Sequence, residues 1–178
     1  MVVLVFGAMM TTFVGVSWAG DKEKILHNFG VVHGDGDLPY AGLTFDMAGN
    51  LYVANSQLPK PRHPKGPGSV TVYAAGSTRL LRTITAGIKN PNALVIDPTG
   101  ILYVSNAIGN TVTVYAPNST QLLRTISNTE QPDALALDSA NNLYVATYPN
   151  IAVYPPNASK PSRKLYKDDV VALVFGPP

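Results

Sequence analysis

A segment of about 40 residues recurs three times along this chain, and this repetition limits the possible fold more than any other feature of the sequence. The best-matched parts of the three copies are residues 42–55, 93–106 and 134–147. They share the pattern small-Leu-x-apolar-Asp-x-x-Gly-x-Leu-Tyr-Val, with Asn in place of Gly in the third copy. Asp97 and Asp138 are 41 residues apart, whereas Asp46 precedes Asp97 by 51, because the first copy carries an insertion. Such a period indicates supersecondary units that pack on their neighbours.

Each unit is predicted to contain four β-strands, which in the second copy are residues 93–97, 101–106, 111–115 and 122–126. These runs are rich in β-branched and aromatic residues and are bounded by Gly, Asn, Pro and Ser. The first run is almost entirely apolar, which predicts a strand buried on both faces. The third alternates Val with Thr, which predicts one face toward solvent or toward a less buried neighbour. Four antiparallel strands in such a unit are typical of a β-propeller blade.

The repeated aspartate is predicted to be architectural. Asp46, Asp97 and Asp138 each open the turn between the first and second runs, where a short carboxylate can accept hydrogen bonds from backbone amides. Gly49, Gly100 and Asn141 follow three residues later, and only Gly and Asn occur there, as a positive φ would require. A repeated calcium site is the alternative, but one carboxylate in each turn supplies too few oxygen ligands.

The pattern of these residues, followed by an Asn-x-Val-x-Val-Tyr strand, resembles NHL-type repeats. It is also similar to related six-bladed propellers, such as the SMP-30/gluconolactonase-like proteins, and the resemblance covers roughly residues 24–175. It implies the architecture and no single function, because propellers carry many activities on one frame. In lactonase-like propellers, acidic and Asn residues near the channel hold a divalent metal, so the resemblance also implies calcium as a candidate cofactor.

We therefore expect an all-β array of four-stranded antiparallel blades in residues 21–178. The blades are expected at residues 41–88, 89–129 and 130–168, with partial blades at 24–40 and 169–178. This makes about three and a half blades, so the array is expected to be incomplete or open. It could be a fragment of a longer product, which is the favoured interpretation, or an assembly with a second copy, or an open arc. An open arc would leave unpaired strand edges through which copies could associate.

Residues 1–20 are predicted to be a secretory signal peptide, since they contain no charged side chain and end in Ser17-Trp18-Ala19 before a charged stretch. A membrane anchor and a buried strand pair are the alternatives. Cleavage near Ala19 or Gly20 would place the protein outside the cytoplasm, either secreted or periplasmic. The chain has no cysteine, which excludes disulfides and thiolate sites. Its net charge of +2 gives no basis for nucleic-acid binding, and membrane contact is expected only if the N-terminal segment is retained.

Polar residues that end or precede the strands are expected to gather on one face of the array. The first strands of all blades start at that face and the second strands end there, so the candidate ligand-binding residues are Asn55, Asn92, Asn106 and Asp133. The alternative is that these side chains only satisfy backbone groups at strand ends. The insertion at residues 57–68 falls on the same face, and its Lys60, Arg62 and Lys65 could cover an anionic ligand. The alternative for this loop is a solvated connection with no ligand.

Two functions follow from these residues. The first is an exported, non-catalytic propeller that binds a protein, a glycan or another ligand, with no cofactor. The alternative is a metal-dependent lactonase or hydrolase of the SMP-30-like class, in which Asp133, Asn92 and Asn106 would be the ligand candidates. The first is favoured because the sequence contains no Gly-x-Ser-x-Gly elbow, P-loop or metal-binding histidine spacing.

Overall fold

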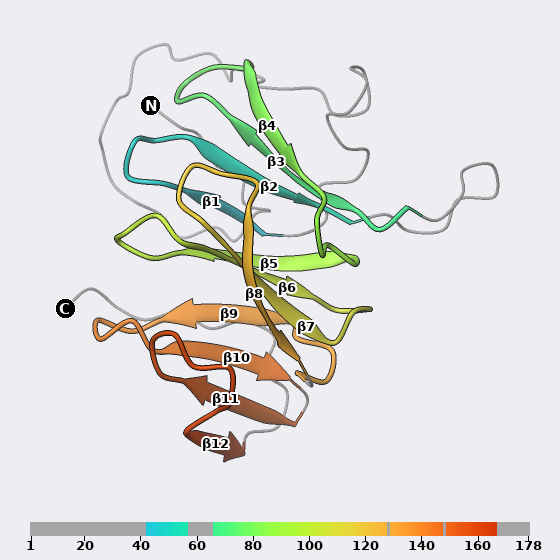
Figure 1. The fold of residues 1–178 in the computed structure, drawn as a ribbon, viewed down its shortest axis with the longest axis vertical. Coiled ribbons are helices and arrows are strands. Elements are labelled where there is room, and N and C mark those ends of the chain that lie inside the picture. Colours follow the sequence, from blue (N-terminus) through green and yellow to red (C-terminus); the bar gives the residue numbers. More distant parts are fainter. Residues whose placement is uncertain (1–41, 57–65, 128, 148, 167–178) are drawn as a thin grey trace, which may run out of the picture.

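The computed structural model describes residues 42–56, 66–127, 129–147 and 149–166, and every regular element in them is a β-strand (Figure 1). The strands form three four-stranded antiparallel sheets, in the order β1-β2-β3-β4, β5-β6-β7-β8 and β9-β10-β11-β12. The first sheet comprises β1 (Leu43–Phe45), β2 (Leu51–Asn55), β3 (Ser69–Tyr73) and β4 (Leu80–Ile84). The second comprises β5 (Pro91–Ile96), β6 (Leu102–Asn106), β7 (Thr111–Tyr115) and β8 (Leu122–Ser127), and the third β9 (Ala134–Leu137), β10 (Leu143–Thr147), β11 (Asn150–Tyr154) and β12 (Arg163–Tyr166).

The predicted all-β array of four-stranded blades is confirmed, and the three sheets do not close into a ring. The predicted signal peptide at residues 1–20 and the partial blades at 24–40 and 169–178 lie outside the described residues. None of the described residues belongs to a helix that could span a membrane.

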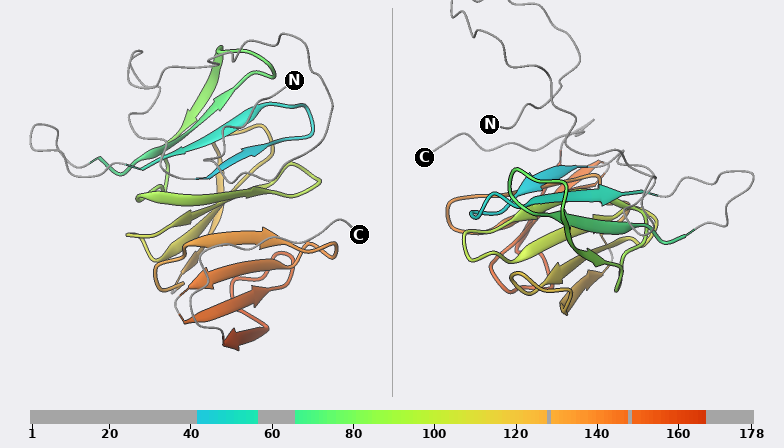
Figure 2. Two further views of the ribbon diagram at one scale, coloured as in Figure 1. Left: turned by 180° about the vertical axis from the view of Figure 1, so that it is seen from behind. Right: turned by 90° about the horizontal axis from the view of Figure 1, so that it is seen from above.

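The sheets are stacked face to face in chain order, as Figures 1 and 2 show. The first strand of each sheet makes the closest contacts with its neighbour: β5 lies against β1 and β2, and β9 lies against β5 and β6. Side chains alternate between the two faces of each strand, so each sheet presents one face to the preceding sheet and one to the following sheet.

Two apolar cores fill the interfaces between the sheets. In the first core, Tyr52, Val72 and Ile84 of the first sheet pack against residues of the second sheet that include Leu94, Val104 and Tyr115. In the second core, the opposite face of the second sheet contributes Tyr103, Val112, Val114 and Ile126, which meet Leu135, Val145 and Tyr154 of the third sheet. The middle sheet is therefore covered on both faces, and its neighbours are joined through it.

The third strand of each blade is more buried than the sequence suggested. The prediction of one less buried face was wrong: β3 and β7 are buried along both faces, and Thr71 and Thr113 are almost inaccessible. Their hydroxyls are tolerated because each meets a buried amide, Thr71 from Asn55 and Thr113 from Asn106, at 3.0 Å in both cases. The first strands, which were predicted to be buried on both faces, differ among themselves: β9 is buried along most of its length, β5 is only partly buried and β1 is largely exposed.

Replacing Thr113 with Val is expected to destabilise the protein by about 1–3 kcal/mol, because it leaves the buried amide of Asn106 and the hydroxyl of Tyr115 without their shared partner. The isosteric change removes the hydroxyl without opening a cavity. Thr125→Val, at an exposed position paired with Thr113 on β8, is the matched control and should change stability little. Urea denaturation of both variants measures the difference, and equal stabilities would contradict a role for the hydroxyl.

Candidate functional site

In each sheet, the start of the first strand lies beside the end of the second strand, as predicted. Pro91 at the start of β5 pairs with Asn106 at the end of β6, and the amide of Asp133 donates to the carbonyl of Ala146 near the end of β10. At these strand ends the structure brings Asn92 and Asp133 together. The Asn92 side-chain amide donates to the carbonyl oxygen and to the carboxylate of Asp133, at 3.3 Å each. This exposed Asn92–Asp133 pair bridges the second and third sheets.

Asn55 and Asn106 occupy different surroundings from the Asn92–Asp133 pair. Both are fully buried, with 0% of their surface exposed. Each Nδ2 group donates to the Thr of the third strand and to the carbonyl of the residue two positions earlier, and the Asn106 side-chain oxygen accepts the amide of Lys89 at 2.9 Å. Both amides therefore join neighbouring strands, and Asn106 also anchors the connection that leads into β5, which is the structural alternative that the sequence left open.

The three basic residues of the predicted lid, Lys60, Arg62 and Lys65, lie outside the described residues. The end of that loop is described, and there the carbonyl of Pro67 accepts the amide of Asn90 at 2.6 Å. Gly68 is held at φ 87° against the carbonyl of Asn55 and the ring of Pro91, so close that a Cβ atom would lie 2.6 Å from each. The end of the loop, just before β3, therefore lies against the second blade beside the start of β5.

The described residues offer a poor set of ligands for a divalent metal. No group of three or more His, Asp, Glu or Cys side chains converges among them. Calcium takes six to eight oxygen ligands, and Asp133 faces the amide nitrogen of Asn92. Among the described residues, Asp133 would therefore be the single carboxylate of such a site. We derive no metal-dependent step from this residue.

The repeated aspartates act in the turns, as predicted. One carboxylate oxygen of Asp46 accepts the amides of Ala48 and Asn50, at 3.0 and 2.9 Å. Asp97 and Asp138 repeat this arrangement with the amides two and four residues later. The residues expected to need a positive φ have one: 80° at Gly49, 88° at Gly100 and 59° at Asn141. These carboxylates are thus occupied by the amides of their own turns.

A chain of polar contacts that the sequence analysis missed continues from two of these aspartates. The second carboxylate oxygen of Asp46 accepts the hydroxyl of Tyr52 at 3.4 Å, and Arg82 donates to that hydroxyl at 2.6 Å from above the ring. In the third sheet, Asp138, Tyr144 and Arg163 repeat the arrangement. Burial raises the pKa of Tyr52, and the opposing effect of the Arg82 charge is smaller.

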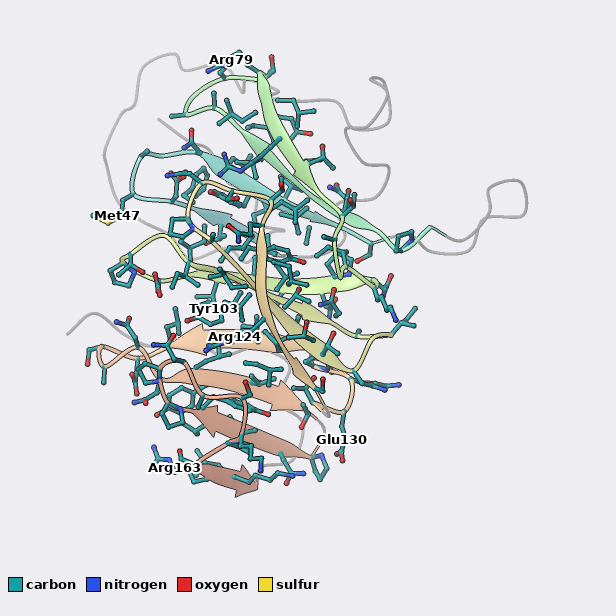
Figure 3. The ribbon with its side chains drawn as sticks, viewed as in Figure 1. Met47, Arg79, Tyr103, Arg124, Glu130 and Arg163 are labelled. Carbon is teal, nitrogen blue, oxygen red and sulfur yellow. The ribbon has the colours of Figure 1, made fainter. Side chains whose placement is uncertain are left out.

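In the second sheet, Tyr103 and Arg124 lie side by side in the corresponding place (Figure 3). Burial, followed by the charge of Asp97, raises the pKa of Tyr103, and Arg124 acts in the opposite direction. The signal in the sequence was the Arg that occurs at the same place in each fourth strand. In the first and third blades these hydrogen bonds tie the turn to the outermost strand, so we regard them as structural.

Comparisons with known proteins give the fold and no closer relationship. No protein-family model matches the sequence, and no curated protein matches it either. Among solved structures, hydrazine synthase of Kuenenia stuttgartiensis is similar with a TM-score of 0.63 and 20% identity, over 82% of this chain and 42% of that chain.

Two further solved structures are similar. The computationally designed protein Ika8 has a TM-score of 0.58 and 18% identity, over 76% of this chain and 39% of that chain. A structural-genomics target provisionally assigned as a gluconolactonase has a TM-score of 0.60 and 18% identity, over 76% of this chain and 51% of that chain. This chain thus spans about half the length of these structures or less, and the likeness establishes a propeller-like fold.

Asp138 is expected to make stability depend on acid pH. Burial acts to raise its pKa, but hydrogen bonds from the Asn142 side chain and from the amides of Asn142 and Ala140 outweigh this and hold the pKa below the ordinary 3.8. A lowered pKa in the folded state stabilises the protein above the unfolded-state value, and the contribution is lost as the pH falls through the folded-state value.

Asp138→Asn should therefore be less stable than the parent protein at pH 7, and the two should converge at a pH below the folded-state value. Urea denaturation at both pH values measures this. Ser139→Ala, an exposed change in the same turn, is the control and should show no such convergence. A difference between Asp138→Asn and the parent that does not change with pH would contradict the role of the charge.

Proposed function

We propose that this chain is an exported propeller module of NHL-like repeats that binds its ligand without catalysis, at the face that carries the Asn92–Asp133 pair. The observation that carries the proposal is that the exposed, charged Asp133 of one blade is hydrogen-bonded to the half-buried Asn92 of the preceding blade. Of the four polar residues expected on this face, Asn55 and Asn106 are fully buried and their side-chain amides donate to neighbouring strands, which leaves the accessible Asn92 and Asp133 for a ligand.

The chemistry of the pair favours a ligand rich in hydrogen-bond donors. A carboxylate has more acceptor positions than the one that Asn92 occupies, so Asp133 can accept further bonds from hydroxyl or amide groups. Its position is fixed by the backbone bond from its own amide to Ala146, at 2.9 Å. Glycan hydroxyls and peptide amides both meet this requirement. Lys60, Arg62 and Lys65, on the insertion after β2, would add affinity for an acidic ligand.

Glycan binding is the first form of the proposal to test. Titration calorimetry of the full chain with soluble chito-, cello- and peptidoglycan oligosaccharides should identify a binder, and Asp133→Asn should weaken that binding by about tenfold or more. Asn92→Ala should weaken it as well, whereas Asn157→Ala, an exposed asparagine in the β11–β12 turn, should not. Binding that is indifferent to both Asn92 and Asp133 would contradict the proposed face.

Activity and metal-binding assays on the same full chain test the lactonase alternative. Turnover of glucono-δ-lactone that requires calcium or zinc, together with stoichiometric metal binding that is lost in Asp133→Ala, would replace the binding module with an enzyme. We expect neither, because Asp133 has no second carboxylate beside it among the described residues that could complete a metal site.

Export is proposed from the first 20 residues. When the full coding sequence is expressed in a secretion-competent host, the protein should leave the cytoplasm and begin at Gly20 or Asp21, since signal peptidases cut after small residues such as those at Ser17 and Ala19. Intact-mass and N-terminal analysis of the exported protein measures the cleavage site. Replacing Ala19 with Arg should block cleavage, and a retained, uncleaved parent chain would contradict export by this route.

A further inference from the structure

The third blade departs from the first two at a buried position that the repeat otherwise keeps. In the first sheet Asn55 pairs with Thr71, and in the second Asn106 pairs with Thr113. The third sheet has Thr147 and Ala152 at the corresponding places, so the asparagine is replaced by the shorter threonine and the threonine by the smaller alanine. The tyrosine that follows is kept as Tyr154, but its neighbour two residues earlier carries no hydroxyl.

The connection that enters the third blade also differs. Six residues separate Ile84 from Pro91, and among them Ile88 is buried, at 2% exposure, in the first core. Five residues separate the corresponding Ile126 and Pro132, and Thr129 and Glu130 lie in this shorter connection. No apolar side chain takes the place of Ile88 there.

These changes leave a cavity of about 250 Å³ between the outer parts of the second and third sheets. Its lining includes Thr129, Glu130, Thr147, Asn150, Ala152, Tyr154 and Lys164, together with Lys160 of the β11–β12 turn. A water molecule takes up about 30 Å³ in the liquid, so the space suits a small organic molecule. None of its lining residues belongs to the Asn92–Asp133 pair.

One end of the cavity carries hydrogen-bond acceptors. The side-chain oxygens of Thr129 and Asn150 are buried, and neither has a hydrogen-bond partner. Glu130 adds a carboxylate beside them, at the end of the third sheet opposite Arg163 (Figure 3). Glu130 and Gln131 also have φ values of 44° and 50°, a left-handed conformation that is uncommon for such residues. The amide of Gln131 donates to the side-chain oxygen of Asn110 at 2.8 Å, and the amide of Thr129 donates to the backbone carbonyl of Asn110 at 3.2 Å. Both residues are therefore joined to the β6–β7 turn.

Two lysines and a tyrosine supply hydrogen-bond donors elsewhere in the cavity. Asn150, Ala152 and Tyr154 alternate onto the face of β11 that meets the second sheet, so the tyrosine lies roughly 13 Å from Asn150 along the strand. Lys164 is paired with Ala152 between them, and Lys160 follows Tyr154 in the turn. Burial raises the pKa of Tyr154, so its hydroxyl remains protonated and able to donate. The cavity thus has an acceptor end and a cationic end.

We propose that this cavity binds a small zwitterion, a free amino acid or a dipeptide. Its ammonium group has three N–H donors, which Glu130, Asn150 and Thr129 can accept, and its carboxylate is met by Lys164 and Lys160. The single carboxylate of Glu130 gives the ammonium an opposite charge where two neutral oxygens lack a partner. This site is separate from the Asn92–Asp133 pair and goes beyond the proposed ligand-binding face.

Titration of the full chain with glycine, L-alanine and glycylglycine tests the charge requirement. At least one of these should bind, and N-acetylglycine and glycinamide, which each lack one charge, should bind at least about tenfold more weakly. Glu130→Gln should weaken zwitterion binding and reduce the preference over N-acetylglycine. Lys164→Met should reduce the preference over glycinamide. The proposal would be overturned if all these probes bound equally, or if no zwitterion bound. It would also be overturned if acetate bound as tightly as the zwitterions.

Filling the cavity is the second test, because it restores what the other blades already contain. The double variant Thr147→Asn with Ala152→Thr rebuilds the buried pair of the first two sheets. It should abolish zwitterion binding while its thermal midpoint does not fall. Asp133→Asn should leave zwitterion binding unchanged, which separates this site from the proposed glycan-binding face. Undiminished binding in the folded double variant would place the ligand elsewhere and overturn the proposal.

Discussion

The packing of one face of each sheet against the next sheet is the contact on which the whole arrangement depends. Each blade is four short strands wide and apolar on both faces, so it cannot bury its own surface and must be covered by neighbours. Tyr52 and Val72 meet Leu94 and Val104, and Tyr103 and Val114 meet Leu135 and Val145 in the same relation one blade later. The alternation of side chains along each strand fixes which residues face which neighbouring sheet. A shift of the strand pairing by one residue would move every side chain to the opposite face.

Polar groups are accommodated within this packing by short, repeated contacts. The turn aspartates accept the amides of their own turns, and the buried asparagines of the first two blades bind the threonines of the neighbouring strand. These contacts satisfy groups that would otherwise be costly to bury. The third blade keeps the turn but loses the Asn–Thr pair, and the cavity opens at that place. The turn aspartate is thus kept in all three blades, whereas the buried Asn–Thr pair is absent from the third blade, where the proposed ligand would bind.

The strands were predictable because their signals are local. Residues 111–115 were expected as a strand and form β7 with the same limits, and the positive φ at Asn141 followed from the alternation of Gly and Asn at one turn position. Burial was less predictable. The Val–Thr alternation of β7 suggested a partly solvated strand, yet Thr113 is buried because Asn106 reaches its hydroxyl from the neighbouring strand. Asn106 and Asn92 also looked equivalent in the sequence, although only Asn92 lies at the surface beside Asp133.

The sequence by itself determined the repeat, the four strands of each blade, their turns and the edge at which the strand ends gather, because period, alternation and turn residues act over short distances along the chain. The tertiary structure decided which polar residues are accessible and where space remains. Thr129, Asn150 and Lys164 come from three separate elements, and their meeting around one cavity depends on how the third sheet stacks on the second. A missing side chain such as that of Ala152 becomes a cavity only when no residue of the facing sheet fills the space it leaves.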